Sequence, residues 1–173
     1  MLFDHPYMKV AAWHIRNHRG RERDFIVTEN RDVTIVFPLT AAGQVVGIRQ
    51  YYVAKAQPVW TLPTGMVDPG ETPLSTARKE LLEEAGCTAT KFISLGTGIK
   101  GKYSSGTLHY YLALGTQAGQ PQELEDAEDI SVKIFSLQQF SHMLTSGKIP
   151  EAWIAVGAYR ALEYIKIKQL ARN

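Results

Sequence analysis

Three glutamates, Glu80, Glu83 and Glu84, form the densest group of ionisable side chains in the sequence, within the segment KELLEEAG. Positions i, i+3 and i+4 share one face of a helix, so the spacing predicts that the three carboxylates converge. Like charges at this spacing repel each other unless a cation lies among them. Mg²⁺ binds through a few carboxylates together with water and substrate phosphate. The pattern therefore indicates either a divalent-metal site or a solvated acidic face of a surface helix.

A helix over residues 73–85 is predicted to carry these glutamates. Thr72 is a suitable N-cap, Pro73 suits the first helical position, and Gly86 can end the helix in a left-handed conformation. Apolar residues recur at steps of three and four and give the helix one stripe to bury, formed by Leu74, Ala77, Leu81 and Ala85. The preceding residues 57–70 are rich in Pro and Gly and are predicted to be largely loop. Glycines there allow the backbone to approach a metal or a substrate closely.

Strand patterns flank this helix on both sides. Residues 32–39 and 44–53 predict a β-hairpin around a glycine-containing turn, and FIVTE, residues 25–29, predicts a short strand before it. Further strands are predicted at residues 91–98, 108–115 and 129–136. Ser136 then begins a short helix that ends at Gly147, and Pro150 starts a long C-terminal helix. The outline predicts an α+β fold or an α/β sandwich, with a mixed sheet, a central helix and C-terminal helices.

The composition narrows the class of protein. The chain has 173 residues, 45% hydrophobic and 21% charged, which predicts one globular domain over residues 1–173. A net charge of +2 without a clustered basic stripe argues against a nucleic-acid partner. The single cysteine, Cys87, excludes an intramolecular disulfide framework and a multi-cysteine zinc site. We find no apolar run that would span a membrane and no signal peptide, so a cytoplasmic location is expected.

The spacing around the glutamates matches a longer pattern, G-x5-E-x7-[R/K]-E-U-x-E-E-x-G-U, where U is an aliphatic residue. It begins at Gly65 and Glu71, continues through Lys79 and the three glutamates, and ends at Gly86 and Cys87. This segment resembles the Nudix box, and the resemblance implies a Nudix α/β/α sandwich that hydrolyses a pyrophosphate bond with Mg²⁺ or Mn²⁺. Lys79 replaces the usual arginine and keeps the charge, but it lacks the planar fork that binds a carboxylate through two hydrogen bonds.

The resemblance also implies roles for residues of the box. Glu80 and Glu84 are expected to be the main metal ligands, and Glu83 is expected to be an additional or water-bridged ligand. The backbone carbonyl of Thr64 is a further candidate ligand, and Gly65 is expected to lie close to the substrate. Glu83 and Glu84 are accordingly also candidate catalytic residues.

Outside the box the chain resembles one group of Nudix enzymes, the ADP-ribose and nucleoside-diphosphate-sugar pyrophosphatases. VVGIRQYYV followed by WTLPTG is similar to that group's RQYR and ELPAG motifs, and SGKIPEAW is similar to the start of its C-terminal helix. The loop EDAEDISVKIFS is similar to the acidic loop that supplies the group's catalytic base. Glu128 is the first candidate for the base and Asp126 the second; the alternative is a solvated acidic loop.

Several residues are candidates for substrate contacts. Arg49 is suited to clamp a phosphate or the terminal ribose, or else it is a surface charge on a strand. Trp13 or Trp60 is suited to stack on a base, although packing is the commoner fate of a tryptophan. Lys102, in a loop rich in Gly and Ser, is suited to contact sugar or phosphate, or else it is simply exposed.

Two departures from the group's motifs broaden the expected range of substrates beyond ADP-ribose to other nucleoside diphosphate sugars. The group often has a proline where this chain has Lys102, and Thr61 replaces the glutamate of ELPAG. Members of the group are commonly homodimers whose N-terminal strands exchange, and residues 1–30 are compatible with that role. They are equally compatible with a sheet packed within one subunit.

The sequence thus predicts Mg²⁺-dependent hydrolysis of ADP-ribose or a related nucleoside diphosphate sugar. The products would be a nucleoside monophosphate and a sugar phosphate. One alternative is a Nudix enzyme that acts on nucleoside triphosphates or dinucleoside polyphosphates. Another, from a different class, is a regulator that binds nucleotide sugars on an inactive Nudix scaffold.

Overall fold

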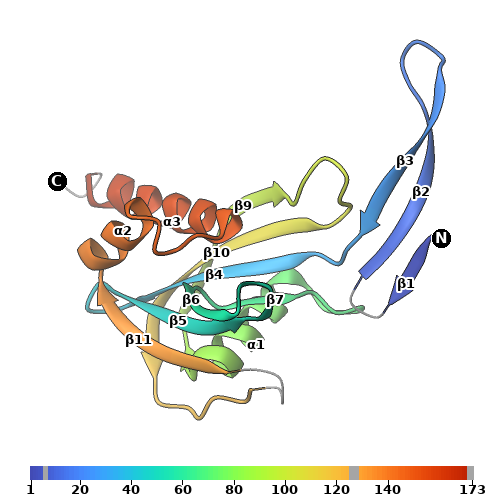
Figure 1. Ribbon diagram of the computed structural model, residues 1–173. Helices are drawn as coiled ribbons and strands as arrows, with labels where there is room; N and C mark the ends of the chain where they lie inside the picture. The colour runs from blue at the N-terminus through green and yellow to red at the C-terminus, as the bar shows by residue number, and fades with distance from the viewer. Residues whose placement is uncertain (6–7, 125–128, 171–173) are drawn as a thin grey trace.

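A mixed β-sheet with helices on both faces forms the body of the protein in the computed structural model (Figure 1). The structure describes residues 1–5, 8–124 and 129–170. Its early strands are β1 (Phe3–His5), β2 (Met8–Arg16), β3 (Glu22–Glu29), β4 (Val33–Thr40), β5 (Gln44–Tyr52), β6 (Gln57–Thr61) and β7 (Thr64–Met66), with a short 3₁₀ turn at Val53–Lys55. Helix α1 (Pro73–Ala85) precedes β8 (Cys87–Thr88), β9 (Lys91–Ile99), β10 (Thr107–Ala118) and β11 (Ile130–Ser136), and α2 (Leu137–Thr145) and α3 (Ala152–Leu170) close the chain.

The sheet is built around β4. Its strand order is β11-β5-β4-β10-β8, with β6 added to β5, β7 added to β4 and β9 added to β10. Strands β4 and β10 run parallel, whereas β10 pairs with β9 and β5 pairs with β11 in antiparallel fashion. The predicted mixed sheet and the strands near residues 91–98, 108–115 and 129–136 are confirmed.

Both faces of β4 are covered. Val33, Ile35, Phe37 and Leu39 point into a core shared with α2 and α3, which cover one face of the sheet. Val36 points into a second core, where Ala77, Leu81 and Ala85 of α1 cover the other face. Period-two alternation along a strand separates these two sets of side chains. The α/β/α sandwich implied by the resemblance is therefore the observed fold.

The hairpin predicted at residues 32–39 and 44–53 opens directly after its turn. Strands β4 and β5 pair at Leu39 and Val45, and farther along β6 binds β5 while β7 binds β4. The prediction that residues 57–70 are largely loop is wrong, because the diverging strands leave backbone edges that this segment pairs with. Pro58 lies on β6, which pairs with β5 alone among the described strands, and edge strands of this kind tolerate proline.

Helix α1 begins and ends where the sequence predicts. The Thr72 side chain accepts a hydrogen bond from the Ser75 N–H, and the Ser75 side chain accepts one from the Thr72 N–H, which forms a capping box. Gly86 adopts a left-handed conformation at φ 58°. A Cβ at Gly86 would lie 2.4 Å from the Gln120 carbonyl oxygen, so glycine is required there by conformation and by space.

The N-terminal strands form a separate three-stranded sheet, β1-β2-β3, which extends away from the body as an arm (Figure 1). The base of the arm contacts the loop before β10, where the Thr28 N–H donates to the Tyr103 carbonyl at 2.9 Å and Phe25 stacks on Tyr103. Apolar side chains on the arm are exposed, among them Met8, Trp13, Ile15 and Ile26. Within the described part of the chain, no helix is both long and apolar enough to cross a membrane.

Candidate active site

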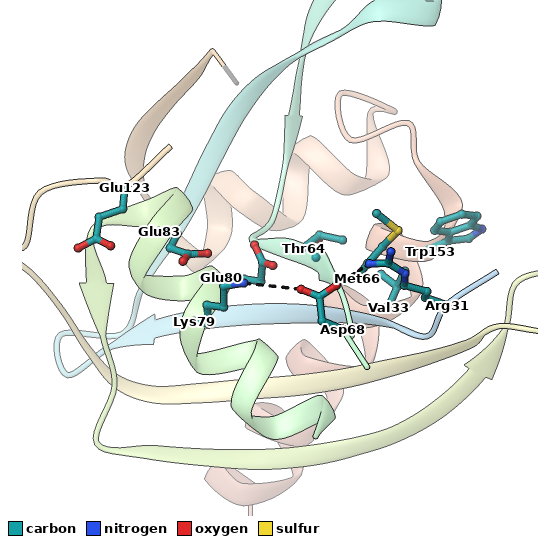
Figure 2. A pocket seen from close by; sticks show the side chains of 11 residues that line it. Arg31, Val33, Thr64, Met66, Asp68, Lys79, Glu80, Glu83, Glu123 and Trp153 are labelled. Atoms are coloured by element: carbon teal, nitrogen blue, oxygen red, sulfur yellow. Dashed lines mark hydrogen bonds and ion pairs between the residues drawn. The ribbon is translucent and has the colours of Figure 1, made fainter. Parts of the chain in front are cut away.

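A pocket of about 390 Å³ lies where α1, β7, the start of β4 and the start of α3 meet (Figure 2). Residues from all four elements line it, together with one residue before β4, one after β7 and one after β10. They are Arg31, Val33, Thr64, Gly65, Met66, Asp68, Lys79, Glu80, Glu83, Glu123 and Trp153.

The three glutamates of α1 have different surroundings. Glu80 and Glu83 line the pocket, whereas Glu84 is 3% exposed and lies on the stripe that α1 buries. The Glu84 carboxylate accepts a hydrogen bond of 2.7 Å from the Thr64 N–H. A buried carboxylate is costly unless such a donor faces it. The position of the Glu84 carboxylate is therefore fixed by helix α1, which carries it, and by the hydrogen bond from the backbone of β7.

Gly65 provides the space that Glu80 occupies. A Cβ at Gly65 would lie 1.8 Å from Glu80 Oε1, a distance that no side chain can accept. The Glu80 carboxylate therefore packs directly on the Gly65 backbone, at the place where β7 lies beside α1. That Gly65 lies close to a metal or a substrate stays a prediction.

Positive charge lies beside the glutamates. Lys79 Nζ is 3.9 Å from Asp68 Oδ2, and Asp68 also forms an ion pair with Arg31 (Figure 2). The charge of Glu83, followed by those of Glu71, Glu80 and Asp68, raises the pKa of Lys79. Lys79 therefore stays protonated and offsets the like charges on the helix.

Glu71 lies at the entry to α1. Its carboxylate accepts a hydrogen bond of 2.6 Å from the hydroxyl of Thr76, which is itself fully buried. This bond fixes the glutamate beside the first turn of the helix and satisfies a hydroxyl that burial would otherwise penalise.

The phenol of Tyr52 joins the end of β5 to the start of α3. Its hydroxyl donates to the Glu151 carboxylate, and the ring is half-buried. Burial, then the hydrogen bond to Glu151 and the nearby charge of Glu84, raises the pKa of Tyr52 well above its usual range. Tyr52 therefore stays neutral and acts as a donor that positions the first turn of α3 next to the pocket.

The oxygen groups in and beside the pocket suit a hard divalent ion. The candidate ligands from the resemblance are Glu80, Glu83, Glu84 and the Thr64 carbonyl, all of which bind through oxygen. Over residues 1–5, 8–124 and 129–170, no three His, Cys, Asp or Glu side chains are arranged to hold a metal ion by themselves. A bound ion would therefore complete its shell with water or substrate phosphate, as Mg²⁺ usually does.

The candidate bases Asp126 and Glu128 lie outside the described residues, so their predicted role stays a prediction. On the same loop, Glu123 lines the pocket, and its N–H donates to the Glu83 carbonyl at 3.0 Å. The sequence analysis did not single out Glu123, which lies two residues before the acidic run EDAEDISVKIFS.

The predicted substrate residues Arg49, Trp13 and Lys102 lie outside this pocket. Arg49 lines a second pocket of about 310 Å³ with Trp60 and Lys148. Trp13 lies on the arm, where its indole N–H donates to Glu29 at 2.8 Å. Lys102 is exposed in the loop before β10, with its ammonium 5.3 Å from the centre of the Tyr103 ring.

Arg31, Met66 and Trp153 line the pocket without having been predicted as site residues. They come from the segment just before β4, from β7 and from α3, which are far apart in the sequence. None of them belongs to the spacing pattern of the glutamates. Only the fold brings them together.

Comparisons with known proteins agree with this fold. The family model described as the NUDIX domain matches residues 29–154. The chain is 23% identical over 155 residues to an ADP-ribose pyrophosphatase of Bacillus subtilis (strain 168), covering 88% of this chain and 80% of that protein. It is 24% identical over 142 residues to an ADP-ribose pyrophosphatase of Mycobacterium tuberculosis, covering 80% of this chain and 68% of that protein. A crystal structure of an ADP compounds hydrolase superposes with a TM-score of 0.82 at 20% identity, covering 96% of this chain and 91% of that one.

The contact between Gly65 and Glu80 generates a prediction. Gly65→Ala should weaken binding of Mn²⁺ by about tenfold or more, because the added methyl group displaces the Glu80 carboxylate. Isothermal titration calorimetry with Mn²⁺ measures the change. Gly101→Ala is the matched control, since no atom lies within 4 Å of its added Cβ, and its affinity should equal that of the wild type. Equal affinity in Gly65→Ala would show that the Glu80 carboxylate is not a ligand in this position.

Proposed function

The chain belongs to the Nudix family, and from this premise we propose that it hydrolyses the pyrophosphate bond of ADP-ribose or a related nucleoside diphosphate sugar, with Mg²⁺ or Mn²⁺. The observation that carries the proposal is the Glu80 carboxylate packed on Gly65, inside a pocket that Glu83 also lines. The names of the two bacterial relatives support the substrate class. The products are a nucleoside monophosphate and a sugar phosphate.

The residues of α1 have distinct proposed roles. Glu80 and Glu84 would hold the metal, Glu83 would bind it directly or through water, and the Thr64 carbonyl would add a ligand. When bound, the divalent ion neutralises phosphate oxygens and lowers the pKa of water. The hydrogen bond from the Thr64 N–H orients Glu84, and Lys79 limits the repulsion within the carboxylate group.

The acidic loop supplies the proposed base. Glu128, or Asp126 in second place, takes the proton of the attacking water as its oxygen bonds to phosphorus and the bridging phosphorus–oxygen bond breaks. The electron pair of that bond leaves with the departing phosphate. Glu123, earlier in the same segment, lines the pocket.

Trp13, Arg49 and Lys102 are proposed substrate contacts that the pocket of a single chain does not include. A second copy of the chain, docked through the arm, would bring further side chains towards the substrate. We accordingly propose a homodimer in which residues 1–30 form the dimerisation segment.

The substrate class has a direct test. Purified protein incubated with ADP-ribose and other nucleotide sugars should release a nucleoside monophosphate only when Mg²⁺ or Mn²⁺ is present, and chromatography of the products measures it. Nucleoside triphosphates and dinucleoside polyphosphates belong in the same panel. Faster turnover of those compounds would replace the proposed substrate class, and binding of nucleotide sugars without hydrolysis would favour the regulator.

The variant Glu84→Gln tests whether Glu84 is needed for catalysis without disturbing the fold. The substitution keeps the size of the side chain and an oxygen that can accept from the Thr64 N–H, but it removes the negative charge. We expect kcat to fall at least about a hundredfold while the circular dichroism spectrum stays the same. Glu163→Gln, at an exposed position on α3, should leave kcat unchanged. A wild-type rate in Glu84→Gln would contradict the metal assignment.

The proposed dimer depends on the apolar surface of the arm. Ile26→Lys, at a residue that is 55% exposed on β3, should convert the dimer to a monomer in analytical ultracentrifugation, because a charge would be buried at the interface. Ile167→Lys is the matched control on α3, where the residue is 54% exposed, and it should remain dimeric. A monomeric wild type would contradict the proposal.

A further inference from the structure

Two buried hydroxyl groups differ from the other polar groups of the interior. Within the residues that the structure describes, the side-chain oxygens of Thr34 and Thr61 are buried and have no hydrogen-bond partner. Thr34 is 0% exposed on β4, and Thr61 is 2% exposed on β6. A hydroxyl that gives up water and gains no partner destabilises the fold. Such a group needs an explanation, and for Thr34 the surroundings supply one.

Strand β4 itself does not require this hydroxyl. Valine has a similar shape, favours strands as well as threonine does, and has no polar atom to bury. The cross-strand neighbours do not use the hydroxyl either. Thr34 pairs with Gly65 on β7 and with His109 on β10, and His109 Nε2 lies 2.8 Å from the Asp32 carboxylate instead. Neither the pairing nor the packing of β4 therefore explains a threonine at this position.

The Thr34 side chain lies on the same face of the sheet as Glu80. Val36, two residues along β4, packs against the buried stripe of α1, and period-two alternation places Thr34 on that face too. Thr34 and Gly65 are direct partners of an antiparallel pair, so their Cβ positions share a face and are about 5 Å apart. Glu80 Oε1 lies 1.8 Å from the position that a Cβ of Gly65 would take. The Thr34 hydroxyl and the Glu80 carboxylate are therefore neighbours between β4 and α1.

A carboxylate that binds a divalent ion needs a donor of this kind. It keeps lone pairs beyond those that face the ion, and hydrogen bonds to these lone pairs fix its orientation. For Glu84 the Thr64 N–H is such a donor, at 2.7 Å. Glu80 points from α1 towards β7 (Figure 2), and the Thr34 hydroxyl is a buried donor next to it.

We propose that Thr34 is a positioning residue for Glu80, and that its hydroxyl donates to the Glu80 carboxylate when a divalent ion is bound. The inference rests on the proposed role of Glu80 as a metal ligand, and it does not depend on the identity of the substrate. Two consequences follow. The hydroxyl strengthens metal binding, and it lowers the stability of the protein when no metal is present.

Titration of the full chain with Mn²⁺ in a calorimeter tests the first consequence. Thr34→Val should weaken Mn²⁺ binding about tenfold, and Thr34→Ser, which keeps the hydroxyl, should bind within about twofold of the wild type. Thr116→Val is the matched control, because Thr116 is also 2% exposed but its hydroxyl donates to the Ala113 carbonyl on β10. Its Mn²⁺ affinity should equal that of the wild type. Wild-type affinity in Thr34→Val would overturn the proposal.

Thermal unfolding in the presence of a chelator tests the second consequence. Thr34→Val should raise Tm by about 2 to 4 °C, because the variant no longer buries an unsatisfied hydroxyl. Thr116→Val should lower Tm, because it removes a hydrogen bond that is formed. A merely structural role for Thr34 would likewise lower Tm, and a lower Tm in Thr34→Val would therefore overturn the proposal.

A double variant separates this proposal from the metal assignment. In a Glu80→Gln background, Thr34→Val should weaken Mn²⁺ binding no further, because the two residues act through one hydrogen bond. A further tenfold loss would overturn the proposal while leaving Glu80 as a ligand. Wild-type affinity in Glu80→Gln alone would overturn the metal assignment of Glu80 and the role of Thr34 together.

Discussion

The contact between α1 and β7 is the constraint on which the site depends. Glu80 packs on Gly65, and the Thr64 N–H donates to Glu84, so two neighbouring residues of β7 position two carboxylates of the helix. Neither interaction forms unless β7 pairs with β4, because β4 places this short strand beside the helix. The pairing of β7 in turn requires that β4 and β5 diverge after their turn.

Groups around the site offset the electrostatic cost of placing its carboxylates close together. The carboxylates of α1 repel each other, and burial of Glu84 adds a desolvation cost. Lys79 offsets part of the repulsion, and the buried stripe of α1 stabilises the helix against the second core of the sheet. The capping box at Thr72 and the left-handed Gly86 fix both ends of the helix, so its glutamates cannot relax by fraying.

The start of α3 connects the site to the rest of the body. Tyr52 holds Glu151 in front of this helix, and two residues later Trp153 lines the pocket. The loop after β9 approaches from the other side, through the contacts of Lys100 with Trp153 and with the Arg31 carbonyl. The half of the pocket opposite the glutamates is thus built from segments that are distant in the sequence and that meet only in the folded sandwich.

The sequence by itself determined the local features. These are helix α1 with its caps, most strands, and the spacing that relates Gly65 to the three glutamates of α1. These depend on spacing within some twenty residues, where helical periodicity and turn chemistry are decided locally. Only the tertiary structure decided that residues 57–70 contain two strands, that Glu84 is buried while Glu80 and Glu83 face the pocket, and that Arg31 and Trp153 meet. It also placed Arg49, Trp13 and Lys102 away from the pocket. The physical reason is that strand pairing and cavity walls depend on contacts between distant segments, which the periodicity of either segment alone does not encode.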